Sequence, residues 1–210
     1  MSERKNVLVA GANGTTGRII INLLKKSETY QPIAMVRKQD QKDHFEKQGV
    51  SAVLADLEED LSQAVKNTDK VIFAAGSKGK NIIDVDQEGA KRLIDAAKEA
   101  GLEKFVMLSS MGADNPTVSN DLEDYLKAKQ NADDYLKASA LNYSIVRPGA
   151  LTDDDGTGKI ELKEKLEKRG SISRADVAKT LVEVLDDKLK KNKVFEILAG
   201  DTRIEKAVRS

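Results

Sequence analysis

A tyrosine and a lysine stand four residues apart in "YLKAK", as Tyr125 and Lys129. This spacing places both side chains on one face of a helix. A lysine ammonium stabilises a neighbouring phenolate and lowers the pKa of a tyrosine from about 10. A shift of about three units requires about 4 kcal/mol, which a close cation in a dry site can supply. The pair could therefore transfer a proton; the alternative is the chance spacing of an amphipathic helix.

Three glycines spaced three apart, Gly11, Gly14 and Gly17, directly follow the apolar run "NVLVA" and begin an amphipathic stretch. A helix that starts after such a loop directs free N–H groups and the positive end of its dipole at a bound phosphate. Thr15 and Thr16 add hydroxyl donors. In this context the glycines predict a dinucleotide site, and the alternative is a tight turn that binds nothing.

The residues after the second apolar run bear on which dinucleotide binds. Arg37 lies 20 positions after Gly17, Lys38 follows it, and the first acid is Asp40. An acid at this place accepts from the ribose 2′-OH of NAD, whereas an arginine can bind a 2′-phosphate through two hydrogen bonds. The sequence therefore favours NADP(H) over NAD(H). The alternative is that Arg37 simply begins a solvated loop.

Seven short apolar runs alternate with amphipathic helical stretches along the chain. The runs are Asn6 to Ala10, Pro32 to Val36, Ala52 to Ala55, Lys70 to Ala75, Lys104 to Ser109, Tyr143 to Arg147 and Lys193 to Leu198. They show little polar alternation, as expected of strands buried on both faces. The pattern predicts an α/β protein with a doubly wound parallel sheet, a Rossmann fold, in one domain spanning residues 1–210. Residues 151–173 are polar, have too few apolar residues for a core strand, and are expected to form a small substrate-side excursion over the sheet edge.

Composition excludes several functions. Among 210 residues, 35 Lys and Arg balance 35 Asp and Glu, so no basic field favours nucleic acid or an anionic membrane. No cysteine is available for disulfides, thiolate catalysis or metal binding, and no metal site is expected. His44 is expected to be solvated, and Asp153 to Asp155 to form a solvated loop. The amino-terminal "MSERKNVLV" is not a secretory signal and no stretch is long enough to span a membrane, so a cytoplasmic protein is expected.

The order of several motifs resembles the atypical short-chain dehydrogenase/reductase superfamily. "GANGTTGR", "MVRK", "FVMLSSMGA", "YLKAKQNADDYLKAS" and "YSIVRPGAL" carry the resemblance over nearly the full chain. The chain is most similar to the branch of small single-domain NAD(P)H-binding proteins that includes flavin and biliverdin reductase B and the nitrogen-metabolite-repressor type sensors. The resemblance implies the superfamily's fold and a bound NAD(P)H.

The same resemblance implies roles for individual residues. Ser110, Tyr125 and Lys129 match the catalytic positions, with Ser110 orienting a substrate carbonyl; alternatively, Lys129 only binds the cofactor ribose. Asp56 would bind the adenine amino group, unless it merely caps a helix in "EEDLSQAV". In "VRPGAL", Pro148 would stop strand pairing and Gly149 would free the backbone beside the nicotinamide; the alternative is an ordinary turn. The implied cofactor contacts are Gly11, Asn13, Gly14, Thr15, Thr16, Gly17, Arg18, Arg37, Lys38, Asp56, Leu57, Ala74, Ala75, Gly76, Ser109, Lys129, Pro148, Gly149 and Ala150.

Three functions remain open from the sequence. The first is an NADPH-dependent reductase of a small carbonyl, quinone or flavin-like acceptor, which is a monomer or a homodimer. The second is a non-catalytic NADP(H) sensor that changes its affinity for a partner. The third is a sugar-nucleotide epimerase, for which 210 residues leave little room for a substrate domain.

Overall fold

The computed structural model describes residues 4–76 and 81–210. The first three residues of the amino-terminal stretch, and Ser77, Lys78 and Gly79 of the run "FAAGSKG", lie outside the described residues. Within the described part, nine strands form one sheet in the order β11-β8-β10-β6-β5-β4-β1-β2-β3. The bounds are β1 Lys5–Ala10, β2 Tyr30–Val36, β3 Ser51–Leu54, β4 Lys70–Phe73, β5 Lys104–Leu108, β6 Tyr143–Pro148, β8 Lys159–Lys163, β10 Lys193–Ala199 and β11 Thr202–Arg203.

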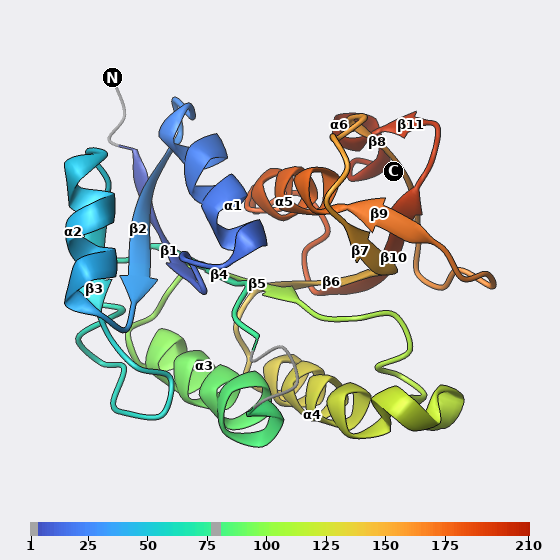
Figure 1. The fold of residues 1–210 in the computed structure, drawn as a ribbon, viewed down its shortest axis with the longest axis horizontal. Helices are drawn as coiled ribbons and strands as arrows, with labels where there is room; N and C mark the ends of the chain where they lie inside the picture. The colour runs from blue at the N-terminus through green and yellow to red at the C-terminus, as the bar shows by residue number, and fades with distance from the viewer. Residues whose placement is uncertain (1–3, 77–80) are drawn as a thin grey trace.

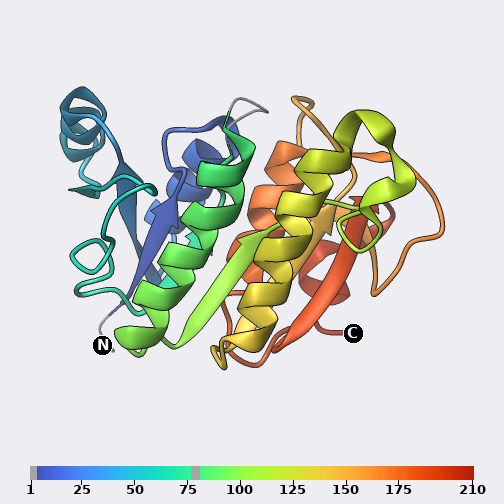
Figure 2. The same ribbon diagram turned by 90° about the horizontal axis from the view of Figure 1, so that it is seen from below.

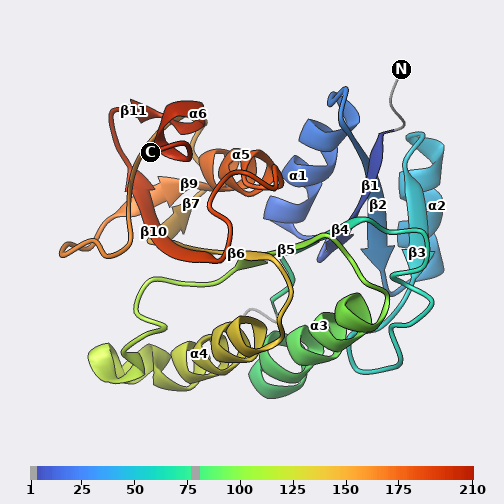
Figure 3. The same ribbon diagram turned by 180° about the vertical axis from the view of Figure 1, so that it is seen from behind.

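Seven strands that are neighbours in this sheet, in the order β10-β6-β5-β4-β1-β2-β3, pair in parallel. They correspond to the seven predicted apolar runs. Helices cover both faces of this sheet, as Figures 1 and 3 show from opposite sides. One face carries α1 (Thr15–Lys25), α2 (Gln39–Lys47), α5 (Arg174–Glu183) and α6 (Ile204–Ala207). On the other face α3 (Gly89–Glu99) and α4 (Glu123–Ala138) run side by side (Figure 2). The predicted doubly wound α/β fold is confirmed.

Two hydrophobic cores, one on each face, fix the strands in place. In β1, Val7 and Val9 pack into the core beneath α1 and α5, whereas Leu8 and Ala10 pack into the core beneath α3. All four side chains are fully buried. Successive residues of a strand point to opposite faces, so a strand buried on both faces needs a continuous apolar run.

The segment from Leu151 to Ser173 contributes more than a surface excursion. It contains β8 and most of a separate two-stranded sheet formed by β7 (Ala150–Thr152) and β9 (Ser171–Ser173). β8 pairs antiparallel with β10 in the main sheet, and Ile160 on β8 is fully buried. The expectation that this region lacks a core strand is wrong, because a strand near a sheet edge needs backbone pairing and only a few buried side chains.

Two local expectations also change. Residues 57–66 form turns, so Asp56 caps no helix there; its Oδ1 accepts a hydrogen bond from the Glu58 amide at 3.2 Å. Pro148 belongs to β6, and its carbonyl accepts from the Met111 amide at 3.0 Å. Pairing continues to Gly149, whose amide donates to the Ile197 carbonyl. A proline lacks a donor but keeps its acceptor, which is why Pro148 does not stop the pairing.

The helices built by residues 4–76 and 81–210 include none with the length and apolar character needed to cross a membrane.

Candidate functional site

The carboxyl ends of the parallel strands meet at one edge of the sheet, and a cavity of about 490 Å³ lies there. It is lined by the segments that follow β1, β2, β3 and β4 and by the start of the helical segment from Ile82. In this topology the strand order reverses between β1 and β4, which is where open α/β sheets bind their ligands. The lining residues are Gly11, Asn13, Gly14, Met35, Val36, Arg37, Gln41, Ala55, Asp56, Leu57, Ala74, Ala75, Gly76, Asn81 and Val85.

The glycine loop closes one side of this cavity. Gly11 has φ +84°, and a Cβ on it would lie 2.6 Å from the Ala75 amide nitrogen. A Cβ on Gly17 would lie 2.1 Å from the Gly11 carbonyl oxygen, so Gly17 lets α1 pack against the loop. Gly14 borders the cavity as the N-cap of α1, which has no side-chain cap. The first-turn N–H groups are therefore available to an anion.

The other residues predicted around this loop occupy different environments. Thr15 is exposed on the first turn of α1, whereas Thr16 is buried. Arg18 donates to the carbonyl oxygen and the side-chain oxygen of Asn13, at 3.2 and 2.7 Å, and so braces the loop. Lys38 is exposed at the N-cap of α2 and does not line the cavity.

The far side of the cavity is formed after β2 and β3. Arg37 is exposed there, and within the described residues its guanidinium has no hydrogen bond or ion pair. Asp56 is half-buried and Leu57 is buried. Met35 and Gln41 also line this side, and Val85 lines the cavity from the helical segment that begins at Ile82. The sequence did not single them out, because apolar strand ends and a helical glutamine carry no motif.

Tyr125 and Lys129 lie on α4 beyond the Gly76 end of the cavity. Lys129 is only 3% exposed, and its Nζ lies 3.2 Å from Oδ1 of Asp86 and 5.5 Å from the centroid of the Tyr125 ring. A Cβ on Gly76 would lie 3.2 Å from the same Asp86 oxygen, so the cavity and the lysine share this carboxylate. Burial alone would lower the pKa of Lys129, but Tyr125 and Asp86 outweigh burial and raise it.

A second buried ion pair lies behind Lys129. Arg147 donates through Nε and Nη2 to Oδ2 of Asp133, at 3.0 and 2.9 Å, and the Ser109 hydroxyl donates to the same oxygen at 2.8 Å. Burial raises the pKa of Asp133, and the neighbouring Arg147 partly offsets this. Arg147 also lies 3.6 Å from Asp114, which pairs with Lys165. These contacts join β6, α4 and the loop after β5.

Asp86, Asp133 and Arg147 were not predicted as site residues. Their signal in the sequence is weak, since an acid on an amphipathic helix and an arginine at a strand end are usually solvated. Their burial and pairing become visible only when β6, α4 and the segment at Asp86 are brought together.

The remaining predicted residues directly follow Ser109 or Arg147 along the chain. Ser110 is half-buried, and its hydroxyl donates to the Met111 carbonyl at 3.3 Å. Pro148 is buried and Ala150 is exposed. A Cβ on Gly149 would lie 2.4 Å from the Gly170 carbonyl oxygen, so close packing with that segment accounts for this glycine. Its expected role beside a nicotinamide stays a prediction.

Two residues expected to be solvated, His44 and Asp153, are exposed. His44 is exposed and lies 2.9 Å from the side-chain nitrogen of Gln48. Asp153 is exposed and pairs with Arg174 at 2.7 Å. Across residues 4–76 and 81–210, no cluster of His, Cys, Asp and Glu could hold a metal ion.

The fold and the site define a Rossmann-type dinucleotide-binding protein of the short-chain dehydrogenase/reductase class. Residues 11–188 match the family model described as NAD(P)H-binding. The chain belongs to this NAD(P)H-binding family and to the atypical branch of the superfamily.

Three similar proteins illustrate the family. An "Uncharacterized sugar epimerase YhfK" of Bacillus subtilis is 42% identical over 211 residues, covering 97% of this chain and 98% of that protein. A solved structure from Bacillus halodurans, whose name proposes an NAD-dependent epimerase/dehydratase, is 40% identical with a TM-score of 0.93 and covers 97% of this chain and 98% of its own. The anaerobillin reductase ChuY of Escherichia coli O157:H7 is 25% identical with a TM-score of 0.83, covering 95% and 99%.

The geometry suits NAD(P)H. Gly11 and Gly14 of the glycine loop line the cavity, and the uncapped N-terminus of α1 borders it. Apolar side chains such as Leu57 and Val85 suit an adenine ring, and Arg37 suits an anionic group at the far end. The residues present therefore fit a dinucleotide along its adenosine and phosphate portions.

Proposed function

We propose that the protein is an NADPH-dependent reductase of a small carbonyl, quinone or flavin-like acceptor. One observation carries the proposal: a buried lysine lies between a tyrosine ring and a carboxylate at the end of the dinucleotide cavity. A purely structural lysine would not need a titratable phenol beside it. The name of the ChuY reductase supports the same reaction class.

In this mechanism each side chain has a separate task. NADPH, held by the residues that line the cavity, would supply the hydride that reduces the acceptor. Lys129 stays cationic at neutral pH because its acidic neighbours raise its pKa. Its charge stabilises the Tyr125 phenolate left when the hydroxyl donates its proton to the acceptor oxygen. Ser110 orients that oxygen through its hydroxyl, and Asp133 with Arg147 holds α4 against β6.

The preference for NADPH is proposed from Arg37. Its guanidinium borders the cavity where the adenosine ribose would lie, with no ion pair in the described part of the chain. Such a group can bind a 2′-phosphate, and an acid would repel it. Binding of NADPH and NADH, measured by fluorescence titration, should favour NADPH, and Arg37→Glu should abolish or reverse the preference. Equal affinities in the unmodified protein would contradict this assignment.

The experiment for the reductase is NADPH oxidation measured against a panel of quinones, flavins and aldehydes. Turnover of one class that falls at least about 100-fold in Tyr125→Phe supports Tyr125 as the proton donor. Unchanged turnover in this variant would indicate direct hydride transfer with a proton from solvent. No oxidation across the panel would contradict the reductase and favour the NADP(H) sensor.

An epimerase is the second candidate because two similar proteins carry that name. An epimerase returns the hydride to its own substrate, so it consumes no NADPH. Residues 151–173 contribute to two sheets rather than building a separate substrate domain, which argues against a large sugar nucleotide. Incubation with nucleotide sugars and analysis of the sugar configuration would distinguish this reaction from the reductase.

A further inference from the structure

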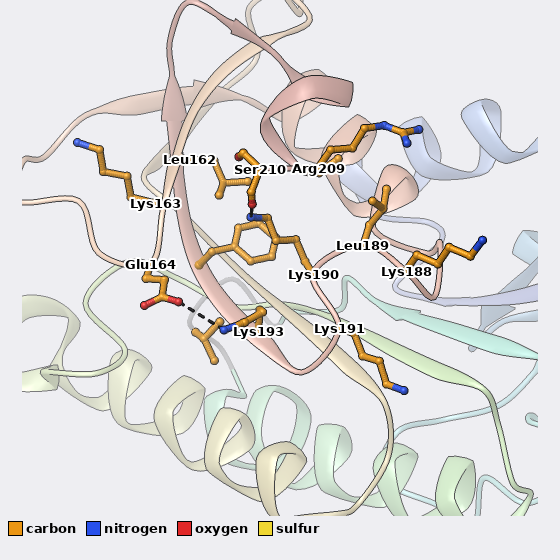
Figure 4. A pocket seen from close by; sticks show the side chains of 13 residues that line it. Leu162, Lys163, Glu164, Lys188, Leu189, Lys190, Lys191, Lys193, Arg209 and Ser210 are labelled. Atoms are coloured by element: carbon orange, nitrogen blue, oxygen red, sulfur yellow. Dashed lines mark hydrogen bonds and ion pairs between the residues drawn. The ribbon is translucent and has the colours of Figure 1, made fainter.

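A second cavity, of about 540 Å³, lies at the opposite end of the sheet (Figure 4). It is bounded by the start of β10, the end of β8, the loop before β10 and the last residues of the chain. None of its lining residues borders the dinucleotide cavity. The lining residues are Leu162, Lys163, Glu164, Lys188, Leu189, Lys190, Lys191, Lys193, Val194, Phe195, Val208, Arg209 and Ser210.

Six cations line this basic pocket, but only one carboxylate side chain does, that of Glu164. Lys193 lies 3.6 Å from Glu164, and Lys163 pairs with Glu161. In the part of the chain that the structure describes, three of the other four cations, Lys188, Lys191 and Arg209, form no ion pair with an acid. The fourth, Lys190, donates to the main-chain oxygen of Ser210.

The acids of the loop "DDKLKKNK" point elsewhere, which explains the excess of positive charge. Asp187 pairs with the buried Lys70 at 2.5 Å. The carboxylate of Asp186 accepts from the Lys188 backbone amide at 2.9 Å. The acids of the loop are therefore engaged outside the pocket, and Lys188 and Lys191 form no ion pair in the described part of the chain.

The backbone of this loop is held in place. Lys190 and Asn192 have positive φ values of 46° and 54°, which residues other than glycine rarely adopt. The Ser144 hydroxyl donates to the Lys190 carbonyl at 2.8 Å, and the Asn192 amide donates to the Tyr143 carbonyl at 2.7 Å. The loop is thus ordered before any ligand arrives, which lowers the entropy cost of binding.

Lys190 reaches the middle of the pocket. Its ammonium donates to the Ser210 carbonyl oxygen at 3.0 Å and lies 5.9 Å from the centroid of the Phe195 ring (Figure 4). Burial and the nearby Lys193 lower the pKa of Lys190. An incoming anion would stabilise this ammonium further, beside the Ser210 oxygen. Lys188 and Lys191 lie at the rim and point outward (Figure 4). Their flexible stems would have to turn inward to reach such an anion.

We propose that this basic pocket binds a small polyanion that carries two or more phosphate groups. Several separated cations match several anionic groups better than a single phosphate, and a concave surface concentrates their field. Phe195 is buried, so no exposed aromatic ring lines the pocket to stack on the bases of a nucleic acid. The neutral net charge of the chain also argues against a long nucleic-acid polymer.

The test is calorimetric titration of the full chain with inorganic triphosphate, in saturating NADPH so that the dinucleotide cavity cannot compete. Binding should be measurable at about 50 mM salt and weaken as salt rises. The double variant Lys190→Gln/Lys191→Gln should bind triphosphate at least about tenfold more weakly, since it loses two charge-assisted hydrogen bonds. Orthophosphate should bind more weakly than triphosphate.

The matched control is Lys26→Gln/Lys66→Gln, which removes the same charge from two exposed lysines that make no ion pair in the described residues. It should keep its triphosphate affinity within about twofold, and both double variants should keep NADPH affinity and thermal stability. Equal losses in the two variants, or no binding by the unmodified protein, would overturn the proposal. Binding to phosphatidylglycerol vesicles but not to triphosphate would also overturn it, by indicating a lipid surface instead.

Discussion

Buried lysines lie at both ends of the parallel sheet, and their partners differ. At the carboxyl end, Lys129 is 3% exposed and faces Asp86 and the Tyr125 ring. At the amino end, Lys70 and Lys104 are 1% exposed. Lys104 donates to two backbone carbonyls that follow α5, whereas Lys70 donates to one such carbonyl and to the carboxylate of Asp187. Carboxylates stabilise a buried ammonium more than carbonyls do, because they carry a full opposite charge.

The pKa values follow this difference. Acidic neighbours raise the pKa of Lys129 in spite of its burial. Burial lowers the pKa of Lys104 to about 8, and the nearby Lys70 contributes in the same direction. Burial alone therefore does not identify a functional lysine. The amino-end lysines hold the segment after α5 against β4 and β5, whereas Lys129 borders the dinucleotide cavity.

Replacement of the carboxyl-end lysine should have the largest effect. If the reductase proposal is correct, Lys129→Met should lower kcat by about 1,000-fold, because the phenolate loses its stabilising cation. The measurement is the rate of NADPH oxidation with saturating cofactor and the best acceptor of the panel. Thermal unfolding serves as the control for folding, because Lys129 is itself an expected cofactor contact. A variant that folds and keeps its turnover would contradict a catalytic role for this lysine.

An amino-end replacement should affect stability rather than catalysis. Lys70→Met removes the donor to the Leu185 carbonyl at 2.9 Å and the partner of Asp187. The free energy of unfolding should fall by about 2 kcal/mol, measured by urea denaturation, because a buried acceptor is left without a donor. NADPH affinity and kcat should not change. A loss of turnover in a Lys70→Met variant that folds would contradict the assignment of a purely stabilising role to the amino-end lysine.

The titration of Lys104 should appear in the pH dependence of stability. Its folded-state pKa of about 8 lies below the ordinary value of 10.5. Between these values the unfolded chain binds more protons than the folded protein, so the free energy of unfolding should rise with pH. The slope is at most about 1.4 kcal/mol per pH unit. The measurement is urea denaturation of the unmodified protein and of Lys104→Met across this pH range. The free energy of unfolding should rise with pH only in the unmodified protein. The same pH dependence in both proteins would contradict the lowered pKa of Lys104.

The exposed partner at the amino end should matter least. The Asp187 side chain is 48% exposed, and Lys70 also lies 3.6 Å from Glu103. Asp187→Asn should therefore lower the free energy of unfolding by less than about 1 kcal/mol, since solvent screens the pair. The difference from the unmodified protein should shrink further in high salt. A loss as large as that of Lys70→Met would show that the carboxylate, not the carbonyl, is the main partner.

The sequence by itself determined the parallel strands of the main sheet, the glycine loop of the dinucleotide cavity and the shared helix face of Tyr125 and Lys129. Strands buried on both faces require continuous apolar runs, and glycine spacing is dictated by close backbone contacts at Gly11 and Gly17. These are local requirements, so they are readable without a structure. Helix periodicity likewise put Tyr125 and Lys129 on one face.

Only the tertiary structure decided which charges are buried and with what partner. The pairing of Lys129 with Asp86, and of Arg147 with Asp133, joins segments that are distant along the chain. The loop "DDKLKKNK" contains both acids and lysines, but folding turns Asp187 toward Lys70 and places Lys190 and Lys191 in the lining of the basic pocket. The free energy of a charge depends on its surroundings in space, which residue spacing along the chain does not specify.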